Sequence, residues 1–264
     1  MKLKEENNAN EEIAAEAKAP ELKTLIPLEK YLEAGVHIGS KYRSGDMRKF
    51  IYKCRNDGLC VLDIAMLNSR IITASKFISR YEPSEVLVVA ARNYAQKPSK
   101  MFAEAIGAMS VIGRFVPGTL TNPGNDNFLE PKLIVTADPP ADRQAIKEAV
   151  TAKIPVLSLC DTSNLTKNID YIIPINNKGK KSLALTYWLL ARECLKIRGV
   201  IEKDSQFDKT TEDFESKAER RSLTEDEKLA MEKQAEERGK RWERDNRSGG
   251  DRGDRRGGGR GRGR

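Results

Sequence analysis

Short apolar runs alternate with amphipathic segments through the middle of the chain. Two of these runs are residues 133–137, Leu-Ile-Val-Thr-Ala, and residues 155–160, Pro-Val-Leu-Ser-Leu-Cys. Each is long enough for a strand that is buried on both faces and too short for a helix. Between them, apolar residues including Ile146 and Val150 recur at helical spacing from Ala141, with charged residues opposite. A strand, an amphipathic helix and a strand predict two parallel neighbours joined by a right-handed crossover.

The predicted helix boundaries depend on capping residues and prolines. Asp138 directly follows the first strand and is the expected N-cap, with Pro139 and Pro140 in the first turn, where a missing N–H costs no hydrogen bond. Pro98 is expected in the same way to open the helix that follows the apolar run 86–91.

The same reasoning predicts the other elements of the sheet and its helical layers. Helices are expected over residues 25–33, with an apolar stripe of Leu28, Tyr31 and Leu32, over 64–80 after an Asp63 cap, and over 182–198. Further strands are expected over 86–91 and 171–175, and residues 107–115 are expected to form a short strand or a crossover. The internal Pro174 favours an edge position for the last strand. The fold class is therefore α/β, with a parallel sheet of about five strands between two helical layers.

A β-hairpin is predicted before the sheet. Residues 50–55 alternate, so that Phe50, Tyr52 and Cys54 are expected on one face and Lys49, Ile51, Lys53 and Arg55 on the other. Asn56-Asp57-Gly58 is a strong turn signal, and residues 59–62 return as the partner strand.

Composition separates a basic body from charged extensions. Of the 264 residues 39% are hydrophobic and 33% charged, and the formal net charge is +8. Residues 22–201 carry 26 Lys and Arg against 16 Asp and Glu, and we interpret them as one basic α/β domain of the kind that binds a polyanion. Residues 1–21 are expected to form a disordered acidic extension, 202–246 a charged linker with a helix over 222–245, and 247–264 a disordered Arg/Gly-rich tail of a type that binds RNA.

Several classes of protein and site are disfavoured. No apolar run approaches the ~20 residues that span a bilayer, and the acidic start is unlike a signal peptide, so a cytoplasmic protein without membrane contact is expected. The four cysteines, Cys54, Cys60, Cys160 and Cys194, contain no CxxC pair. We therefore expect reduced, buried thiols rather than a zinc site or disulfides.

The segments that could bind a nucleotide phosphate do not have the glycine pattern of a phosphate-binding loop. The residues after the run 86–91, Arg92-Asn93-Tyr94, contain no glycine, so the backbone has no close approach to a pyrophosphate. Gly179-Lys180-Lys181-Ser182 resembles the end of a P-loop, but Pro174 occupies the upstream glycine position.

Other catalytic signals are weak as well. His37 is the single histidine, which excludes a His-rich metal site, and the carboxylates Asp138 and Asp161 follow strands, where capping is the commoner role. We expect no catalytic residue, no metal, no cofactor and no small-molecule substrate. An α/β enzyme acting on a small phosphorylated substrate remains the alternative.

Clustered cations give the strongest functional signal. Within one loop and hairpin, basic side chains alternate with Tyr42, Phe50 and Tyr52, a mixture suited to phosphate neutralisation together with base or ribose packing. The candidate RNA-binding residues are His37, Lys41, Tyr42, Arg43, Arg48, Lys49, Tyr52, Lys53 and Arg55, followed in rank by Arg114, Lys178, Lys180 and Lys181.

Several stretches resemble one known family. Residues 114–123, Arg-Phe-Val-Pro-Gly-Thr-Leu-Thr-Asn-Pro, are similar to the signature of the second small-subunit ribosomal protein in its archaeal and eukaryotic branch, which includes the laminin receptor precursor. Supporting stretches, in order along the chain, are residues 35–39, 138–142, 154–162, 173–182 and 190–193. The resemblance covers about residues 28–200.

The resemblance implies a non-enzymatic Rossmann-like core that binds small-subunit rRNA and neighbouring ribosomal proteins. The bacterial branch carries a long helical insertion, and residues 62–81 are too short to hold one, so the archaeal type fits better. The Arg/Gly-rich tail is outside the family pattern, which leaves open a third possibility, a free RNA-binding module acting outside the ribosome.

Overall fold

The computed structural model describes residues 24–201, 207 and 209–216 of the chain. The chain divides into two compact units, residues 1–218 and 219–264, and the second lies wholly outside the described residues. The predictions of disorder over 1–21, a helix over 222–245 and a disordered tail over 247–264 also lie outside them.

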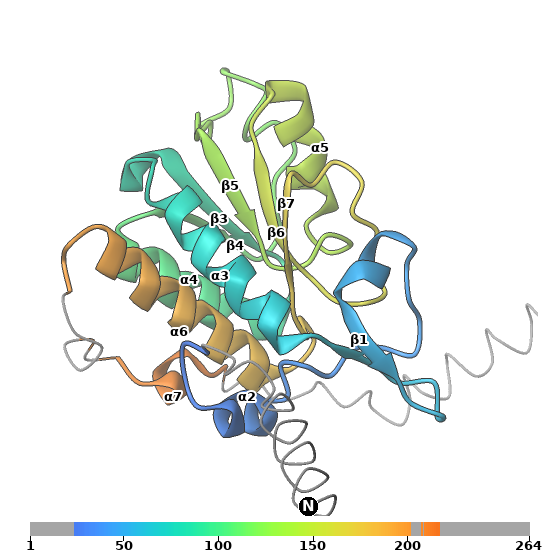
Figure 1. The fold of residues 1–264 in the computed structure, drawn as a ribbon. Coiled ribbons are helices and arrows are strands. Elements are labelled where there is room, and N and C mark those ends of the chain that lie inside the picture. The colour runs from blue at the N-terminus through green and yellow to red at the C-terminus, as the bar shows by residue number, and fades with distance from the viewer. Residues whose placement is uncertain (1–23, 202–206, 208, 217–264) are drawn as a thin grey trace, which may run out of the picture. The chain divides into compact units, whose positions relative to one another are not determined.

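Five parallel strands form the central sheet, as predicted (Figure 1). They are β3 (Val86–Ala90), β4 (Met109–Ile112), β5 (Leu133–Thr136), β6 (Val156–Cys160) and β7 (Tyr171–Pro174), in the spatial order β4-β3-β5-β6-β7. The order reverses beside β3, because the chain passes from β3 to one neighbour, β4, and then to the other, β5. The edge position predicted for β7 is confirmed, and its Pro174 pairs with Cys160 at the strand end.

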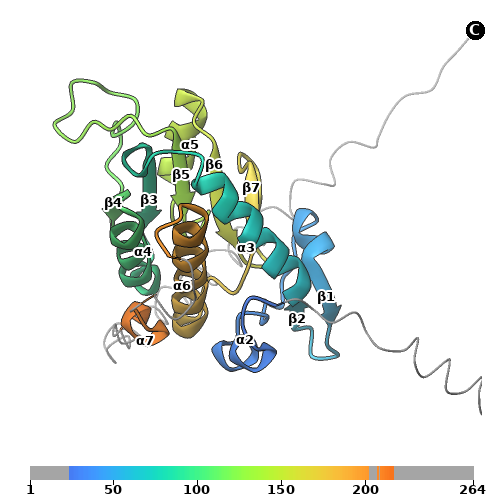
Figure 2. The same ribbon diagram turned by 60° about the vertical axis from the view of Figure 1, so that its left-hand side comes forward.

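Three helices cover one face of the sheet: α3 (Ile64–Ile78), α4 (Asn93–Ile106) and α6 (Lys180–Ile197) (Figure 2). The Asp63 carboxylate caps α3 as predicted and accepts the N–H of Ala65 at 2.8 Å. Helix α6 lies between α3 and α4 and is buried on most of its circumference, whereas Ile197 at its last turn is 44% exposed. This layer holds the larger part of the apolar core.

Helix α5 (Arg143–Ala152) and the segment before β5 cover the opposite face. Ala145, Ile146 and Ala149 of α5 pack with Phe115 and Leu120 against alternate strand residues. Because consecutive strand side chains point to opposite faces, strands covered on both sides appear in the sequence as continuous apolar runs. The two helical layers complete the predicted three-layer fold.

Two short helices pack against α6. Helix α2 (Leu28–Ala34) ends at Gly35, whose φ of 65° closes the helix. Of its expected apolar stripe only Tyr31 is buried, while Leu28 and Leu32 are 45% and 48% exposed. Helix α7 (Thr211–Phe214) packs against α6 through the fully buried Phe214, so the apolar core includes residues beyond 201.

The predicted hairpin is present with a different side-chain pattern. A short 3-10 helix, η1 (Asp46–Phe50), leads into β1 (Ile51–Cys54), which pairs antiparallel with β2 (Cys60–Leu62). The predicted alternation is wrong, because Phe50 belongs to η1 and a register shift between Ile51 and Lys53 changes which side chains share a face. Phe50 is fully buried, whereas Tyr52 is 76% exposed.

Two predicted helix starts are also wrong. Helix α4 begins at Asn93, five residues before Pro98, which lies inside the helix. The φ that the proline ring imposes is compatible with a helix, although the ring removes one backbone N–H donor. Helix α5 begins at Arg143, and Pro139 and Pro140 lie in the preceding turn. Asp138 does not cap this helix, because its carboxylate is committed to Arg92 and two asparagines.

The prediction of reduced, buried thiols is correct for two of the four cysteines and wrong for the other two. Cys54 and Cys60 form a disulfide across the hairpin, whereas Cys160 and Cys194 are free and buried. The pairing follows from the strand register, which places Cys54 directly opposite Cys60, and register is not visible in the spacing of the two residues.

Candidate nucleic-acid interface

The first candidate site is the segment of residues 36–62, which we call the basic ribbon. It comprises the loop before η1, η1 itself and the β1–β2 hairpin. Met47, Phe50 and Leu62 form a separate small core with Cys160 of β6, to which Ile172 of β7 adds. The basic ribbon is thereby fixed to one edge of the sheet, beside β7 (Figure 1).

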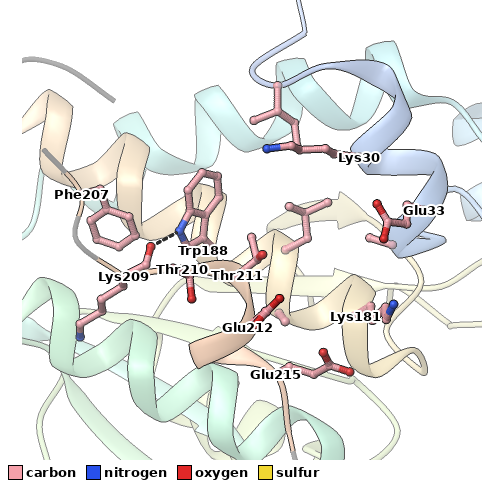
Figure 3. A pocket seen from close by; sticks show the side chains of 14 residues that line it. Lys30, Glu33, Lys181, Trp188, Phe207, Lys209, Thr210, Thr211, Glu212 and Glu215 are labelled. Carbon is pink, nitrogen blue, oxygen red and sulfur yellow. Dashed lines mark hydrogen bonds between the residues drawn. The ribbon is translucent and has the colours of Figure 1, made fainter. Parts of the chain in front are cut away.

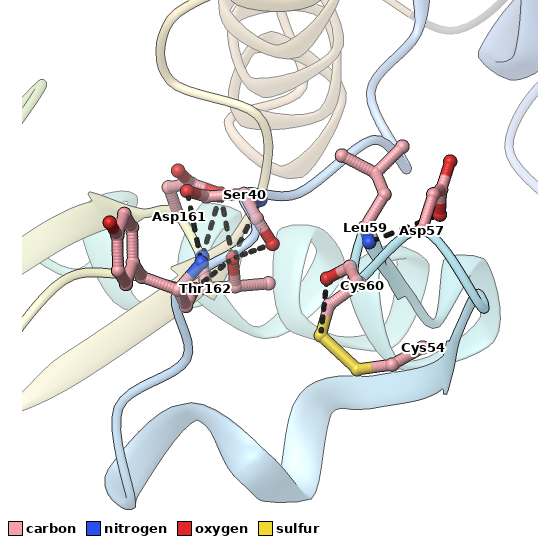
Figure 4. The surroundings of a disulfide bond; sticks show 9 residues. Ser40, Cys54, Asp57, Leu59, Cys60, Asp161 and Thr162 are labelled. Atoms are coloured by element: carbon pink, nitrogen blue, oxygen red, sulfur yellow. Dashed lines mark hydrogen bonds between the residues drawn. A yellow bond between two sulfur atoms is a disulfide. The ribbon is translucent and has the colours of Figure 1, made fainter.

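Thr162, just after β6, holds the loop of the basic ribbon in place (Figure 4). Its Oγ1 accepts the N–H of Ser40 at 2.8 Å and donates to the carbonyl oxygen of Tyr42 at 3.1 Å. Its own carbonyl oxygen accepts the N–H of Ser44 at 2.8 Å. The loop is therefore positioned by backbone contacts, which leave its side chains free to point outward.

A second set of backbone hydrogen bonds joins the loop to β2. The N–H of Leu62 donates to the carbonyl of His37 at 2.8 Å, and the N–H of Gly39 donates to the carbonyl of Cys60 at 2.9 Å. With the isolated antiparallel bridge between Ile38 and Val61, the loop behaves as a short third strand of the hairpin. A lone two-stranded hairpin would be marginally stable in water, and the third segment of backbone gives the basic ribbon additional support.

Six cations of the basic ribbon are exposed. Among the described residues, none of the six is paired with a carboxylate. They are Lys41, Arg43, Arg48, Lys49, Lys53 and Arg55. The Lys49 ammonium lies 5.1 Å from the centre of the Phe50 ring, and Asp46, the acidic residue closest to Lys49 in the sequence, accepts a hydrogen bond from Thr166. The result is a concentrated positive potential with little internal neutralisation.

Two aromatic rings project into solvent among these cations. Tyr42 is 80% exposed and Tyr52 is 76% exposed. Large aromatic side chains are usually at least half covered in folded proteins. Exposed rings beside unpaired cations offer stacking faces for bases next to groups that neutralise phosphates.

Three of the five remaining candidates can be placed by their surroundings. His37 is half-buried at the base of the basic ribbon, and its Nδ1 has no hydrogen-bond partner among the described residues. Lys178 lies beside the loop, because its ammonium contacts Asp161 Oδ2 at 2.7 Å, next to Thr162. The Lys180 ammonium lies 5.2 Å from the ring centre of Tyr94.

Two candidates are separated from the others. Arg114 is exposed just after β4, at the sheet edge opposite to β7, and four strand spacings correspond to about 19 Å. Lys181 is exposed on the first turn of α6 and faces the groove between α2, α6 and α7. The structure therefore brings together the candidates of the basic ribbon and Lys178, and sets these two apart.

The carboxyl ends of β3 and β5, where an α/β enzyme would bind its ligand, hold buried carboxylates. Asp138 contacts Arg92 at 2.6 Å and accepts hydrogen bonds from Asn164 and Asn177. Burial raises the pKa of Asp138, and the neighbouring Arg92 guanidinium opposes that rise. The position already holds a buried anion with its own cation, so it is unsuited to a phosphate.

Asp142 completes this arrangement from the turn before α5. Its carboxylate accepts the N–H groups of Ala91 at 2.8 Å, and of Ala137 and Asp138 at 3.0 Å each. Burial raises the pKa of Asp142 to about 6, although these three hydrogen bonds favour the charged form. The N–H donors that would receive a phosphate are thus occupied by a side chain of the protein itself.

A groove of about 510 Å³ lies away from the sheet edge, between α2, α6 and α7 (Figure 3). Trp188, Leu185 and Phe207 contribute apolar surface, and the Trp188 indole donates to the carbonyl of Lys209 at 2.7 Å. Lysines and glutamates surround it in equal number: Lys30, Lys181, Lys209, Glu33, Glu212 and Glu215. This balance of charge does not favour a polyanion.

The described residues contain no cluster of three or more His, Cys, Asp or Glu side chains arranged to hold a metal ion. Within the same part of the chain, no helix combines the length and the apolar character needed to cross a bilayer.

Reasoning from the sequence missed the residues that position the basic ribbon. Thr162 and Thr166 lie about 120 residues after the segments that they contact, and neither belongs to a charged or aromatic cluster. Lys167, which follows Thr166, is exposed and adds a cation beside η1. The only available signal was the position of Thr162 directly after a buried strand, where residues at the carboxyl edge of a sheet gather.

The fold and its surface define a class of protein: a layered α/β body whose strand ends are occupied by its own buried carboxylates, carrying a basic and aromatic surface suited to nucleic acid. The family model described as ribosomal protein S2 matches residues 31–126 and 124–197. The chain belongs to the ribosomal protein S2 family.

Relatives from archaea support this assignment across most of the chain. A protein of Methanoregula boonei named small ribosomal subunit protein uS2 is 54% identical over 201 residues, which are 76% of this chain and 97% of the relative. Proteins of the same name from Thermoplasma volcanium and Picrophilus torridus are 53% and 51% identical over 192 and 191 residues, covering 73% and 72% of this chain and 96% of each relative. The archaeal type expected from the sequence is confirmed.

Proposed function

We propose that the chain is a structural constituent of the small ribosomal subunit and binds small-subunit rRNA through the basic ribbon. Membership of the ribosomal protein S2 family supports the ribosomal role, together with relatives named as small-subunit proteins. In that particle the chain acts in translation, in the cytoplasm, beside neighbouring ribosomal proteins and without catalytic activity. No observation favours the alternative of an enzyme acting on a phosphorylated substrate.

One observation supports the basic ribbon as the RNA contact: its six cations are exposed and unpaired with carboxylates among the described residues, around two exposed tyrosine rings. Lysine and arginine gain affinity from neutralising phosphates and releasing counterions. Unstacked bases gain affinity from packing on aromatic rings. A rigid ribbon that offers both contacts binds with little ordering of its backbone.

The other candidates extend this proposal. Lys178, whose ammonium is paired with Asp161, lies beside Thr162 at the margin of the loop, and His37 supports the base of the basic ribbon. Arg114, Lys180 and Lys181 would contact other parts of the rRNA, because they lie on other parts of the body.

We also propose that residues 22–201 act as the rRNA-binding domain. The acidic extension 1–21, the charged linker and helix 202–246 and the Arg/Gly-rich tail 247–264 would be additions to it, except that α7 within 202–246 packs into the apolar core of the body. The archaeal relatives match 191–201 residues at 96–97% of their own length, which is consistent with a shared body and additional ends in this chain.

The salt dependence of RNA binding tests the interface. A triple variant, Arg48→Gln, Lys49→Gln and Arg55→Gln, should bind small-subunit rRNA with a log–log salt slope smaller by about 2–3, since each phosphate contact contributes about 0.7–0.9. A matched variant, Lys76→Gln, Lys100→Gln and Lys147→Gln, removes the same charge from exposed positions on α3, α4 and α5. Equal slopes for the two variants would contradict the proposed interface.

Sedimentation tests the role in the particle. In a sucrose gradient of a cell extract, the chain should migrate with small subunits, and the triple variant of the basic ribbon should show lower occupancy. A chain that remains near the top of the gradient would instead support a free RNA-binding module.

A further inference from the structure

We propose that Cys54 and Cys60 form a thiol–disulfide exchange site that regulates the basic ribbon, the oxidised form binding RNA more tightly than the reduced form. This inference rests on the proposed function, because it requires the basic ribbon to contact RNA.

The disulfide joins the last residue of β1 to the first residue of β2, at the outer end of the hairpin next to the turn (Figure 4). Strands β1 and β2 are paired at three positions, Ile51 with Leu62, Lys53 with Val61 and Cys54 with Cys60, and the register shifts between the first two. Beyond the disulfide lies the turn, closed by hydrogen bonds from the Arg55 N–H to the Leu59 carbonyl at 2.8 Å and from the Gly58 N–H to the Arg55 carbonyl at 3.0 Å. On the β2 side, the backbone of Cys60 is also bonded to Gly39 and Ser40 of the loop, whereas on the β1 side the disulfide is the covalent connection that holds Cys54.

Two candidate RNA-binding residues are neighbours of this bond in the chain. Lys53 and Arg55 flank Cys54, and both side chains are exposed. Any gain of freedom at Cys54 is transmitted directly to the backbone of these two cations. The inner part of the basic ribbon is held independently, by Thr162 and by the core around Phe50.

The structure also distinguishes this pair from the other cysteines. Cys54 is half-buried and reachable from solvent, whereas Cys160 and Cys194 are fully buried in the core. Burial raises the pKa of the Cys160 thiol to about 12 and that of Cys194 to about 11, so neither is a thiolate at neutral pH. Thiol chemistry at neutral pH is thus restricted to the hairpin pair.

The exchange requires a dithiol reductant, such as dithiothreitol or a protein of the thioredoxin class. One thiolate of the reductant attacks Sγ of Cys54, which is more accessible than the buried Cys60. The Cys54–Cys60 bond breaks, its electron pair goes to Sγ of Cys60, and that sulfur takes a proton. The second thiolate of the reductant then attacks the reductant's sulfur in the mixed disulfide. This releases Cys54 as a thiolate, which takes another proton. Two electrons and two protons pass to the cysteines, and the reductant becomes a disulfide.

Reduction should weaken RNA binding without abolishing it. The freed end of the hairpin must be ordered again when RNA binds, and this cost falls on the part that carries Lys53 and Arg55. Most of the interface, including the loop and η1, keeps its position. The expected loss is about three- to tenfold in Kd, the usual range for ordering a few side chains and a short turn.

The experiment uses the full-length chain and small-subunit rRNA transcribed in vitro. Affinity is measured for the oxidised protein, for the protein kept in dithiothreitol, and for the double variant Cys54→Ser, Cys60→Ser with and without dithiothreitol. The oxidised protein should bind the rRNA about three- to tenfold more tightly than the reduced one. The double variant should have the Kd of the reduced protein, and this Kd should be the same with and without dithiothreitol. Equal affinity of the oxidised and reduced proteins would overturn the proposal, and so would an effect of dithiothreitol that persists in the double variant.

A parallel measurement separates this proposal from the proposed function. The triple variant Arg48→Gln, Lys49→Gln, Arg55→Gln is measured in both redox states. If it binds more weakly than wild type in both states while wild type is insensitive to redox state, the interface stands and the exchange site is wrong. If the triple variant binds like wild type in both states, the interface itself is wrong.

The redox state in cells provides the last criterion. Thiols are blocked with N-ethylmaleimide during lysis, and the intact mass of the chain is compared with that of a fully reduced sample. Protection of Cys54 and Cys60 from blocking in a fraction of the molecules, with Cys160 and Cys194 never joined to them, supports the site. Complete blocking of both hairpin cysteines under oxidative stress would overturn its regulatory role.

Discussion

A β-carbon on Gly39 would lie 2.5 Å from Cγ2 of Thr162, so only a hydrogen atom fits between the loop of the basic ribbon and the residue that supports it. The same β-carbon would lie 2.8 Å from the carbonyl oxygen of Cys60, a backbone atom that cannot turn away. The close approach that forms the loop's hydrogen bonds therefore requires glycine at this position.

The variant Gly39→Ala tests this contact. It should lower the free energy of unfolding by about 1–3 kcal/mol, because an extra methyl group forces the loop away from Thr162 and Cys60. Chemical denaturation measures the change, and RNA affinity should fall with it. Gly45→Ala is the matched control, because its β-carbon meets nothing within 4 Å and its φ is −58°. Equal destabilisation by both variants would contradict the contact.

Replacing Thr162 by valine keeps its shape and removes its hydroxyl. The N–H of Ser40 then loses its acceptor, and the expected loss of stability is about 1–2 kcal/mol. Hydrogen exchange gives the more specific reading: the Ser40 amide should exchange faster, while the Ser44 amide, bound to the Thr162 backbone carbonyl, should change less. Thr151→Val removes an exposed hydroxyl that bonds within α5, and it should leave both amides unchanged.

The ion pair between Arg92 and Asp138 should be essential for the stability of the body. Asp138 is 1% exposed, so Arg92→Met leaves a buried carboxylate without its cation and should cost about 3–5 kcal/mol at neutral pH. The double variant Arg92→Met, Asp138→Asn should regain part of this stability, since the uncompensated charge is gone. Failure of the second substitution to restore any stability would show that the charge is not the cause.

The raised pKa of Asp142 predicts how the free energy of unfolding depends on pH. Its pKa is about 6 in the folded protein and near 3.9 in an unfolded chain, so the folded state binds more protons between these values. The contribution of this group to stability is complete below about pH 4 and is lost as the pH rises through 6, a change on the order of 2–3 kcal/mol.

Denaturation of the wild type and of Asp142→Asn from pH 4.5 to 7.5 measures this contribution. The wild type should gain stability relative to the variant as the pH falls from about 6.5, and the difference should be constant above that value. A difference that is constant over the whole range would contradict the raised pKa of Asp142.

The sheet could be predicted from the sequence because its strands are covered on both faces. Runs such as residues 86–90 and 156–160 are fully buried, and a short, nearly continuous apolar run is typical of a strand that lies between two helical layers. The edge position of β7 was predictable for a local reason as well, since Pro174 lacks the N–H that a central strand needs. The clustering of exposed cations in the basic ribbon also follows from the sequence, because they are close together in the chain.

Most of the features that were wrong or missed depend on tertiary contacts or on strand register. Asp138 has the position and chemistry of an N-cap, but Arg92, Asn164 and Asn177 bind its carboxylate in the folded protein. The orientation of Tyr52 depends on a register shift, and the pairing of Cys54 and Cys60 depends on strand register. The role of Thr162 depends on a loop that precedes it by more than a hundred residues. None of these dependences leaves a periodic or local pattern.

The separation of 122 residues between Ser40 and Thr162 determines when, during synthesis, the basic ribbon acquires its final form. The basic ribbon leaves the translating ribosome early, but Thr162, which holds its loop in place, is added only after β3, β4, β5 and β6 have been synthesised. At about 5–20 residues per second, that interval is roughly 6–24 s. The newborn chain thus carries its positive charge for many seconds before that charge has a fixed geometry, and selective recognition of a structured RNA begins only when the carboxyl edge of β6 is complete.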